Sequence, residues 1–142
     1  TKCPASVRLQ CDEASALNNL GQAELEMGNT VAAMEAFSSS RKILNELATI
    51  TSDYVIRSNL GGILHNQAIV EESNGNVEAA RSLLVQAIEH QELALQAAPD
   101  SKRCQKFMKE HTSLLSQVAN KIPTRIDEVS PLTNDASAHE KF

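Results

Sequence analysis

Three side chains that could bind a metal ion fall on one face of a predicted helix near the C-terminus. Cys104, Met108 and His111 are spaced four and three residues apart, which places them on one side of an α-helix. A structural zinc site needs about four ligands, and no second group of such residues stands at ligand spacing elsewhere in the sequence. The pattern therefore predicts that these residues either pack in the core or are exposed at the surface, without a metal ion or another cofactor.

The other nucleophiles and bases form no catalytic pattern. The run Ser38-Ser39-Ser40 falls inside a predicted helix, whereas a nucleophilic serine usually stands on a sharp turn with a base beside it. His65 and His90 belong to different predicted helices from His111, and we expect them at helix contacts or in solvent rather than as general bases. The sequence thus predicts no catalytic residues and no enzymatic activity in this chain.

Composition narrows the class of protein further. The 142 residues are 42% hydrophobic but only 3% aromatic, with no Trp, which favours close-packed helices over a β-sandwich. The net charge of −5 disfavours nucleic-acid binding, and no apolar run reaches the ~20 residues that span a membrane. The three cysteines, at positions 3, 11 and 104, match no disulfide framework and are expected to be reduced thiols in the cytoplasm.

An internal repeat organises the chain. When the sequence is shifted by 47 residues, seven of the seventeen positions from 17 to 33 match identically, where chance gives about one. The identities are Leu17 with Leu64, Asn19 with Asn66, Glu24 with Glu71, Gly28-Asn29 with Gly75-Asn76, and Ala32-Ala33 with Ala79-Ala80. Since Gly followed by Asn is a signal for a helix end and a turn, each unit is predicted to be a helix–turn–helix.

Helical periodicity and helix-breaking residues together predict five antiparallel helices in an all-α fold. The helix-ending residues are Gly28, Gly75 and Pro99, and the candidate N-caps are Asp53, Asp100 and Ser101. The expected helices span residues 6–28, 30–51, 53–74, 77–98 and 100–121. They form one domain over 6–122, with a first repeat (6–51), a second repeat (53–98) and a closing helix (100–121), followed by an irregular tail over 123–142.

The predicted apolar stripes resemble those of the tetratricopeptide repeat (TPR) family. The first unit carries the family pattern in Leu17, Leu20-Gly21, Gly28, Ala33 and Phe37, with Ser40 as a small residue at the helix contact. The second unit matches with Leu64, Ala68, Gly75, Ala80, Leu84 and Ala87. Gln67 stands where Leu is expected, and Glu24 and Glu71 stand where Tyr is usual. Other residues expected to face inward are Ala23 in the first unit and Phe107, Leu114, Leu115 and Val118 in the closing helix.

The resemblance covers residues 10–98 and implies a right-handed solenoid of helical hairpins. The 47-residue period exceeds the usual length of about 34. It is similar to a long-helix TPR subtype of planctomycete-type bacterial proteins, whose arrays often follow a Ser/Thr protein kinase domain. The stretch from Ala87 to Gln91 is among the residues that carry this similarity. The sequence itself contains no Gly-rich loop and no HRD or DFG motif, so kinase activity is not expected here.

The family likeness further implies a concave groove that binds a peptide or a partner protein. The residues expected to line it are Asn18, Gln22, His65, Asn66, Ile69, Lys109 and Thr112. Most are uncharged polar side chains, which can hydrogen-bond a peptide backbone; alternatively, they are simply solvated surface. Clamping of a terminal carboxylate is disfavoured, because it needs several cationic donors and only Lys109 is in place.

The function predicted from the sequence is a protein-interaction scaffold that is part of a larger protein. One alternative is a regulatory or substrate-selecting region of a Ser/Thr protein kinase. Another is a structural or oligomerisation segment, such as a homodimer, without a ligand in the groove.

Overall fold

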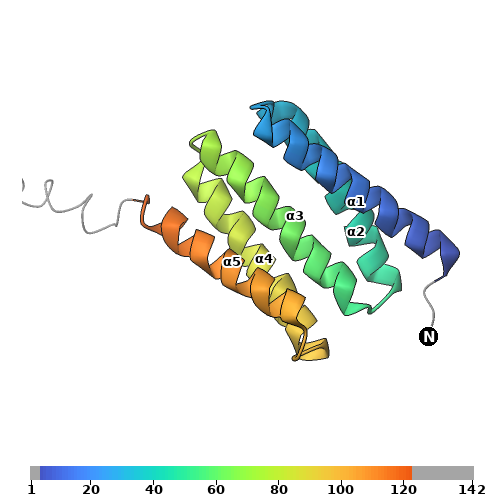
Figure 1. The fold of residues 1–142 in the computed structure, drawn as a ribbon. Helices are drawn as coiled ribbons and strands as arrows, with labels where there is room; N and C mark the ends of the chain where they lie inside the picture. Colours follow the sequence, from blue (N-terminus) through green and yellow to red (C-terminus); the bar gives the residue numbers. More distant parts are fainter. Residues whose placement is uncertain (1–3, 123–142) are drawn as a thin grey trace, which may run out of the picture.

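Residues 4–122 are described by the computed structural model, and within them the chain is all-helical with five helices and no strand (Figure 1). They are α1 (Ala5–Glu26), α2 (Thr30–Ile50), α3 (Tyr54–Ser73), α4 (Val77–Ala97) and α5 (Lys102–Ala119). The five predicted helices are confirmed, each with bounds within two residues of those expected. The predicted tail over 123–142 lies outside the described residues.

The two hairpin turns share one set of interactions. Gly28 and Gly75 have φ angles of +82° and +83°, a left-handed conformation that strongly favours glycine. At the first turn, the backbone N–H of Asn29 donates to the carbonyl of Glu24 at 2.8 Å, and its side-chain amide donates to the Glu24 carboxylate at 2.9 Å. Asn76 makes the same two bonds to Glu71. The Glu, Gly and Asn that recur in the sequence therefore end the first helix of both hairpins in the same way.

Two helices begin at side-chain caps. The carboxylate of Asp53 accepts a hydrogen bond from the backbone N–H of Val55 at 2.9 Å at the start of α3. Ser101, rather than Asp100, caps α5 by accepting from the backbone N–H of Cys104 at 3.2 Å. Each cap satisfies a backbone donor that a helix start leaves without an intrahelical partner.

The helices pack in chain order, each against the next, and α1 and α5 also contact α3. The helices α1, α3 and α5 therefore form one layer, and α2 and α4 lie behind it (Figure 1). Short connections, such as residues 27–29 and 74–76, reverse the chain between neighbouring helices. No helix in the described part of the chain is both long and apolar enough to cross a membrane.

Two apolar clusters hold these layers together. The larger joins α1, α2 and α3, and the smaller joins α3, α4 and α5. The most fully buried large side chains include Phe37, Leu44, Leu47, Ile56, Leu60, Leu64 and Leu84. Burial of a side chain of this size contributes roughly 1.5–3 kcal/mol each, so these residues supply much of the free energy that offsets the ordering of the chain.

The buried face of α1 differs from the predicted one. Leu20 and Ala23 are exposed, and the face that packs on the other helices consists of Val7, Ala14 and Gly21. Small residues there allow a close approach. A Cβ atom on Gly21 would lie 2.6 Å from Cδ1 of the buried Phe37 ring, so that ring occupies the space a larger residue would need.

Ser40 has the contact role predicted for it. Its side chain is fully buried, and its hydroxyl donates to the carbonyl oxygen of Ala14 at 2.7 Å. The small side chain thus lets α2 lie against α1 while leaving no buried polar atom without a partner.

Gln67 of α3 is buried at a position where the family pattern has Leu. Its amide oxygen accepts from Arg41 at 3.2 Å, and its amide nitrogen donates to the hydroxyl of Ser38 at 3.2 Å. Arg41 also donates to Gln86 of α4 at 3.2 Å. This network joins α2, α3 and α4, and it satisfies the buried amide that replaces an apolar side chain.

The closing helix also buries two residues outside its predicted apolar stripe, of which His111 is polar. Val118 is buried as expected, but Phe107, Leu114 and Leu115 are only half-buried. The other fully buried residues of α5 are Cys104 and His111, and His111 is held by hydrogen bonds described below.

Candidate functional site

A groove with a volume of about 310 Å³ runs along the layer formed by α1, α3 and α5. Ser40 and Leu44 of α2 contribute to its lining between α1 and α3. The polar side chains that line it are Ser15, Asn18, Asn19 and Gln22 of α1, Asn59, His65 and Asn66 of α3, and Arg103, Glu110 and His111 of α5. Half of these ten groups are amides, each of which can both donate and accept a hydrogen bond.

Four of the predicted site residues come together in this groove. Asn18, Gln22, His65 and Asn66 all line it, and the amide of Asn66 donates to the side-chain oxygen of Asn18 at 2.8 Å. The repeat brings these two residues together, because α1 and α3 are the first helices of the two hairpins and lie side by side in one layer.

The other three predicted residues lie apart from the main groove. Lys109 lines a shallower depression beside it, which it shares with His65 and Glu110. Thr112 is exposed, and its hydroxyl donates to backbone carbonyls of its own helix. Ile69 is half-buried and lines neither hollow. Ile69 lies beyond His65 and Asn66 on α3, whereas Lys109 and Thr112 flank Glu110 and His111 in the sequence without lining the main groove.

A chain of polar side chains connects the groove to the interior. The Nδ1 atoms of His65 and His111 lie 3.0 Å apart, and the Nε2 atom of His111 lies 3.2 Å from the amide oxygen of Gln91. The amide nitrogen of Gln91 donates to the hydroxyl of Ser58 at 3.0 Å. Gln91 and His111 are essentially fully buried, so this chain crosses the contact between α3, α4 and α5.

These partners fix where the protons lie. Because the Gln91 nitrogen donates to Ser58, its oxygen must accept from His111, which therefore carries its proton on Nε2. The unprotonated Nδ1 of His111 then accepts from the Nδ1–H of His65. This arrangement leaves the Nε2 lone pair of His65 as a hydrogen-bond acceptor on a side chain that lines the groove.

Burial keeps both rings neutral. Burial, with a smaller contribution from the neighbouring His65, lowers the pKa of His111 to about 4. Burial also lowers the pKa of His65, although the charge of Glu110 partly opposes that effect. Near neutral pH the pair therefore adds hydrogen-bonding capacity to the groove without adding charge.

One of the two adjacent glycines in α3 makes room for this polar chain. A Cβ atom on Gly61 would lie 2.9 Å from the Gln91 side-chain oxygen, 3.1 Å from His111 Nε2 and 3.2 Å from the Ala87 carbonyl oxygen. At Gly62, the nearest atom would be 3.7 Å away on Phe107, an ordinary contact distance. Gly61 is therefore required by the buried hydrogen bond, whereas Gly62 is not.

The closing helix contributes groove residues that were not predicted. Arg103 donates to the side-chain oxygen of Asn59, and its guanidinium lies 5.3 Å from the centre of the Phe107 ring. Glu110 lines the groove one turn farther along α5. The spacing of 103, 107 and 110 places the three on one helix face, and this was the sequence signal that could have found them. The groove therefore holds charges of both signs, unlike the nearly uncharged surface expected.

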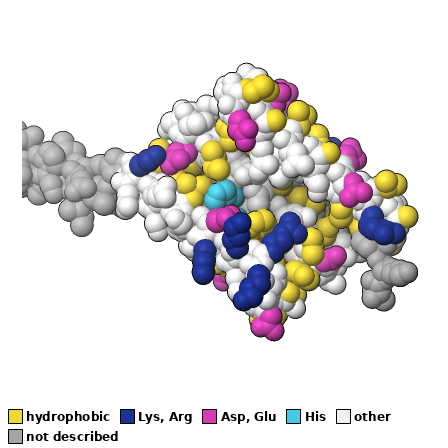
Figure 2. Space-filling model, in the orientation of Figure 1, with side chains coloured by type: hydrophobic (Ala, Val, Ile, Leu, Met, Phe, Trp, Pro, Cys, Tyr) yellow, Lys and Arg dark blue, Asp and Glu magenta, His cyan; other side chains and the backbone are white. Residues whose placement is uncertain are grey.

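The surface around the groove is basic along α5. Lys102, Arg103, Lys106 and Lys109 all belong to this helix, against one acidic residue, Glu110. Figure 2 shows dark-blue basic side chains gathered near the cyan histidine on this face of the molecule. Lys106 lies 4.0 Å from Glu110 in an exposed pair, a contact that contributes little stability.

No metal centre is formed by the described residues: no group of three or more His, Cys, Asp or Glu side chains there is arranged to hold an ion. Of the residues that suggested one, Cys104 and His111 are buried among the helices, and both nitrogens of His111 have hydrogen-bond partners. Their shared helix face is explained by packing.

Comparison with known proteins identifies no relative: no protein-family model, no curated protein and no solved structure matches the chain. Membership of the TPR family and association with a kinase therefore stay predictions.

Proposed function

We propose that this chain is a TPR-like interaction scaffold that binds an extended peptide segment of a partner protein in the groove between α1, α3 and α5. The observation that carries this proposal is the convergence of amide side chains from two helices, Asn18, Asn19 and Gln22 from α1 and Asn59 and Asn66 from α3. A peptide in extended conformation presents unpaired N–H and C=O groups along its length, and side-chain amides can bind both kinds.

The chemistry of the groove favours a polar segment over an apolar one. Besides the amides, it offers the guanidinium of Arg103, the ring of Phe107 and the acceptor on His65. The basic residues along α5 would attract acidic side chains of the segment at the α5 edge of the groove. A globular partner that presents such a segment on a loop would bind in the same way.

Selection of peptides from a random phage-displayed library against the 142-residue chain tests the proposal. A selected peptide, titrated into isotopically labelled protein, is expected to shift the NMR side-chain amide resonances of Asn18, Asn66 and Gln22. Asn59→Ala and Gln22→Ala should each weaken binding several-fold, since each removes one groove donor and acceptor.

The matched controls are exposed polar residues on α2. Asn45→Ala and Ser39→Ala should leave the affinity unchanged, because α2 lies behind the groove layer and neither residue lines the groove. Failure to select any peptide, or resonance shifts confined to α2 and α4, would contradict the proposal.

A further inference from the structure

An apolar stripe runs along the outer face of α1, opposite the face that packs on α2 and α3. Leu9, Leu20 and Met27 are 69%, 50% and 65% exposed, and Ala16 and Ala23 between them are exposed as well. Single exposed apolar residues are ordinary on a protein surface. These five, however, form a row along one helix, with Glu13 in the gap between Leu9 and Ala16, and none of the five lines the groove.

The spacing of the row is that of a helix-pairing surface. Positions 9, 16, 20, 23 and 27 follow the alternating three- and four-residue steps of a heptad seam, interrupted only at Glu13. A 3.5-residue repeat of apolar side chains is the pattern that a second helix covers lengthwise, with its own apolar residues between those of the first. The shape of the surface therefore fits a helix better than a loop or a strand.

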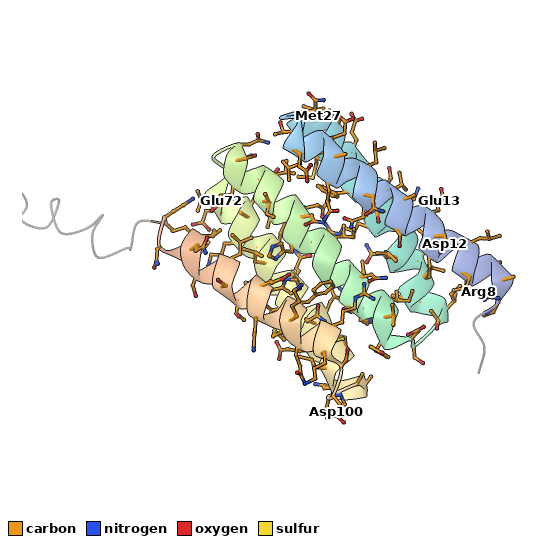
Figure 3. The ribbon with its side chains drawn as sticks, in the orientation of Figure 1. Arg8, Asp12, Glu13, Met27, Glu72 and Asp100 are labelled. Atoms are coloured by element: carbon orange, nitrogen blue, oxygen red, sulfur yellow. The ribbon has the colours of Figure 1, made fainter. Side chains whose placement is uncertain are left out.

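Acidic residues lie beside the row and, at Glu13, within it. The charged residues of α1 are four carboxylates, Asp12, Glu13, Glu24 and Glu26, and one cation, Arg8. The Glu24 carboxylate already bonds Asn29 at the turn, but Asp12, Glu13 and Glu26 are exposed. Figure 3 shows Arg8, Asp12 and Glu13 toward the N-terminal end of α1 and Met27 at its other end. A helix that covers the row would therefore meet exposed carboxylates at Asp12 and Glu13 and again at Glu26.

A second copy of this chain fits the surface poorly. Pairing of two α1 helices would bring Asp12, Glu13 and Glu26 of both copies close to one seam, where like charges repel. The basic helix α5 has the complementary sign, but none of the described large hydrophobic residues that are exposed lies on it. It would therefore cover the acidic flanks without covering the apolar row.

We propose that the outer face of α1 binds an amphipathic helix of another protein, one that carries large apolar residues at heptad spacing and Lys or Arg on both flanks. The partner helix would cover Leu9, Leu20 and Met27 and would pair with the exposed carboxylates. This surface does not depend on the groove, so the two bind separately.

The first test uses synthetic peptides of 22 residues, the length of α1. One peptide has Leu at the heptad seam positions and Lys on the flanks. A second replaces each flanking Lys by Glu, and a third has the composition of the first with the periodicity scrambled. By fluorescence anisotropy, the full chain is expected to bind the first peptide at least about tenfold more tightly than either control, with the preference decreasing as salt screens the flanks.

Variants locate the binding surface. The double variant Leu20→Ser with Met27→Ser should weaken binding of the Lys-flanked peptide by about tenfold or more, because it removes two large side chains from the row. The matched control, Val85→Ser with Leu93→Ser, removes two exposed apolar residues of α4 and should change it less than about twofold. Asp12→Asn with Glu13→Gln should weaken binding several-fold at low salt. The matched control, Glu35→Gln with Glu46→Gln, removes two exposed carboxylates of α2 and should leave binding unchanged. Circular dichroism checks that each variant folds.

Three results would overturn the inference. One is equal binding of the Lys-flanked and Glu-flanked peptides, and another is equal weakening by the α1 and α4 variants. The third is a dimer of the chain, seen by analytical ultracentrifugation, that the Leu20→Ser and Met27→Ser variant converts to a monomer, since a second copy would then be the occupant. Gln22→Ala in the groove should leave peptide binding at α1 unchanged.

Discussion

The Nδ1 atoms of His65 and His111 share one hydrogen at a separation of 3.0 Å. His65 donates it, and His111 uses its other nitrogen to donate to the buried amide of Gln91. A second proton on His111 would leave two Nδ1–H groups facing each other in a buried site. The hydrogen-bond chain is thus compatible with neutral rings, and acid disrupts it at its centre.

The stability of the protein should therefore depend on pH. The pKa of His111 is lowered from 6.5 to about 4 in the folded chain, so the unfolded chain binds a proton first as the pH falls. This contribution to the free energy of unfolding is fully present above about pH 6.5 and is lost as the pH falls toward 4, on the order of 3 kcal/mol in all. Urea denaturation at a series of pH values measures it.

His111→Gln provides the control for that experiment. Glutamine keeps an amide near Gln91 but cannot titrate, so the decrease between pH 6.5 and 4 should be much smaller in the variant. An NMR titration of the His111 ring protons with a midpoint near 6.5 in the folded wild-type chain would contradict the prediction.

The adjacent glycines of α3 should respond in opposite directions to the same substitution. Gly61→Ala places a methyl group 2.9 Å from the Gln91 oxygen and 3.2 Å from the Ala87 carbonyl oxygen, so it should disrupt the buried bond and cost about 1–3 kcal/mol. Gly62→Ala meets only an ordinary contact with Phe107 and should stabilise by up to about 1 kcal/mol through helix propensity. Thermal and urea unfolding of the two variants provide the comparison; equal effects would show that the polar chain does not restrict position 61.

The contact between Gly21 and Phe37 predicts a coupled pair of substitutions. Gly21→Ala should destabilise by roughly 1–3 kcal/mol, because its Cβ atom would overlap the buried ring. With Phe37→Leu in the background, the cost of Gly21→Ala should decrease by at least about 1 kcal/mol, although Phe37→Leu alone leaves a cavity. A double-mutant cycle measures the coupling, and additive effects would mean that the ring moves aside freely.

The two kinds of helix start should differ in their sensitivity to alanine. Asp53→Ala and Ser101→Ala each remove a side-chain cap and should cost about 1 kcal/mol. Asn76→Ala removes an exposed bond to Glu71 but no cap, since the Asn76 side chain does not accept from α4. It should cost only a few tenths of a kcal/mol. A loss at Asn76 as large as at Asp53 would contradict this distinction.

The helices themselves could be predicted because their signals are local. Glycine at a left-handed position, Asp53 at a helix start and Pro99 between helices act through neighbouring backbone atoms, so the sequence alone indicates where each helix begins and ends. The 47-residue repeat allowed us to predict that the chain forms two similar hairpins. From this it followed that Asn18 and Asn66 would lie in the same groove, where they form a hydrogen bond.

The choice of face on α1 could not be predicted in the same way. Hydrophobicity favours the row with Leu20, yet Ala14 and Gly21 face inward. Distance decides this point, because Phe37 and Ser40 of α2 lie too close for large residues opposite them. That distance is a property of two helices together, which the periodicity of one helix does not contain.

The burial of His111 could not be decided from the sequence for a related reason. A polar residue is normally assigned to solvent, and the bonds that justify its burial come from Gln91 on α4 and His65 on α3. Each of these residues also looks like a surface residue when considered singly. Only their juxtaposition in three dimensions makes the set self-consistent.

The hydrogen bond between Asn18 and Asn66 makes the groove selective for ligands that can replace it with hydrogen bonds of their own. A ligand that inserts between these two amides must break their 2.8 Å hydrogen bond. An apolar group would leave a donor and an acceptor without partners, at a cost of about 1–3 kcal/mol each where water is excluded. A peptide bond offers one donor and one acceptor in return, so the exchange is nearly neutral for a backbone and unfavourable for a hydrocarbon. The hydrogen bond between the two amides thus competes with any ligand at this position. A ligand must supply at least one donor and one acceptor to replace it.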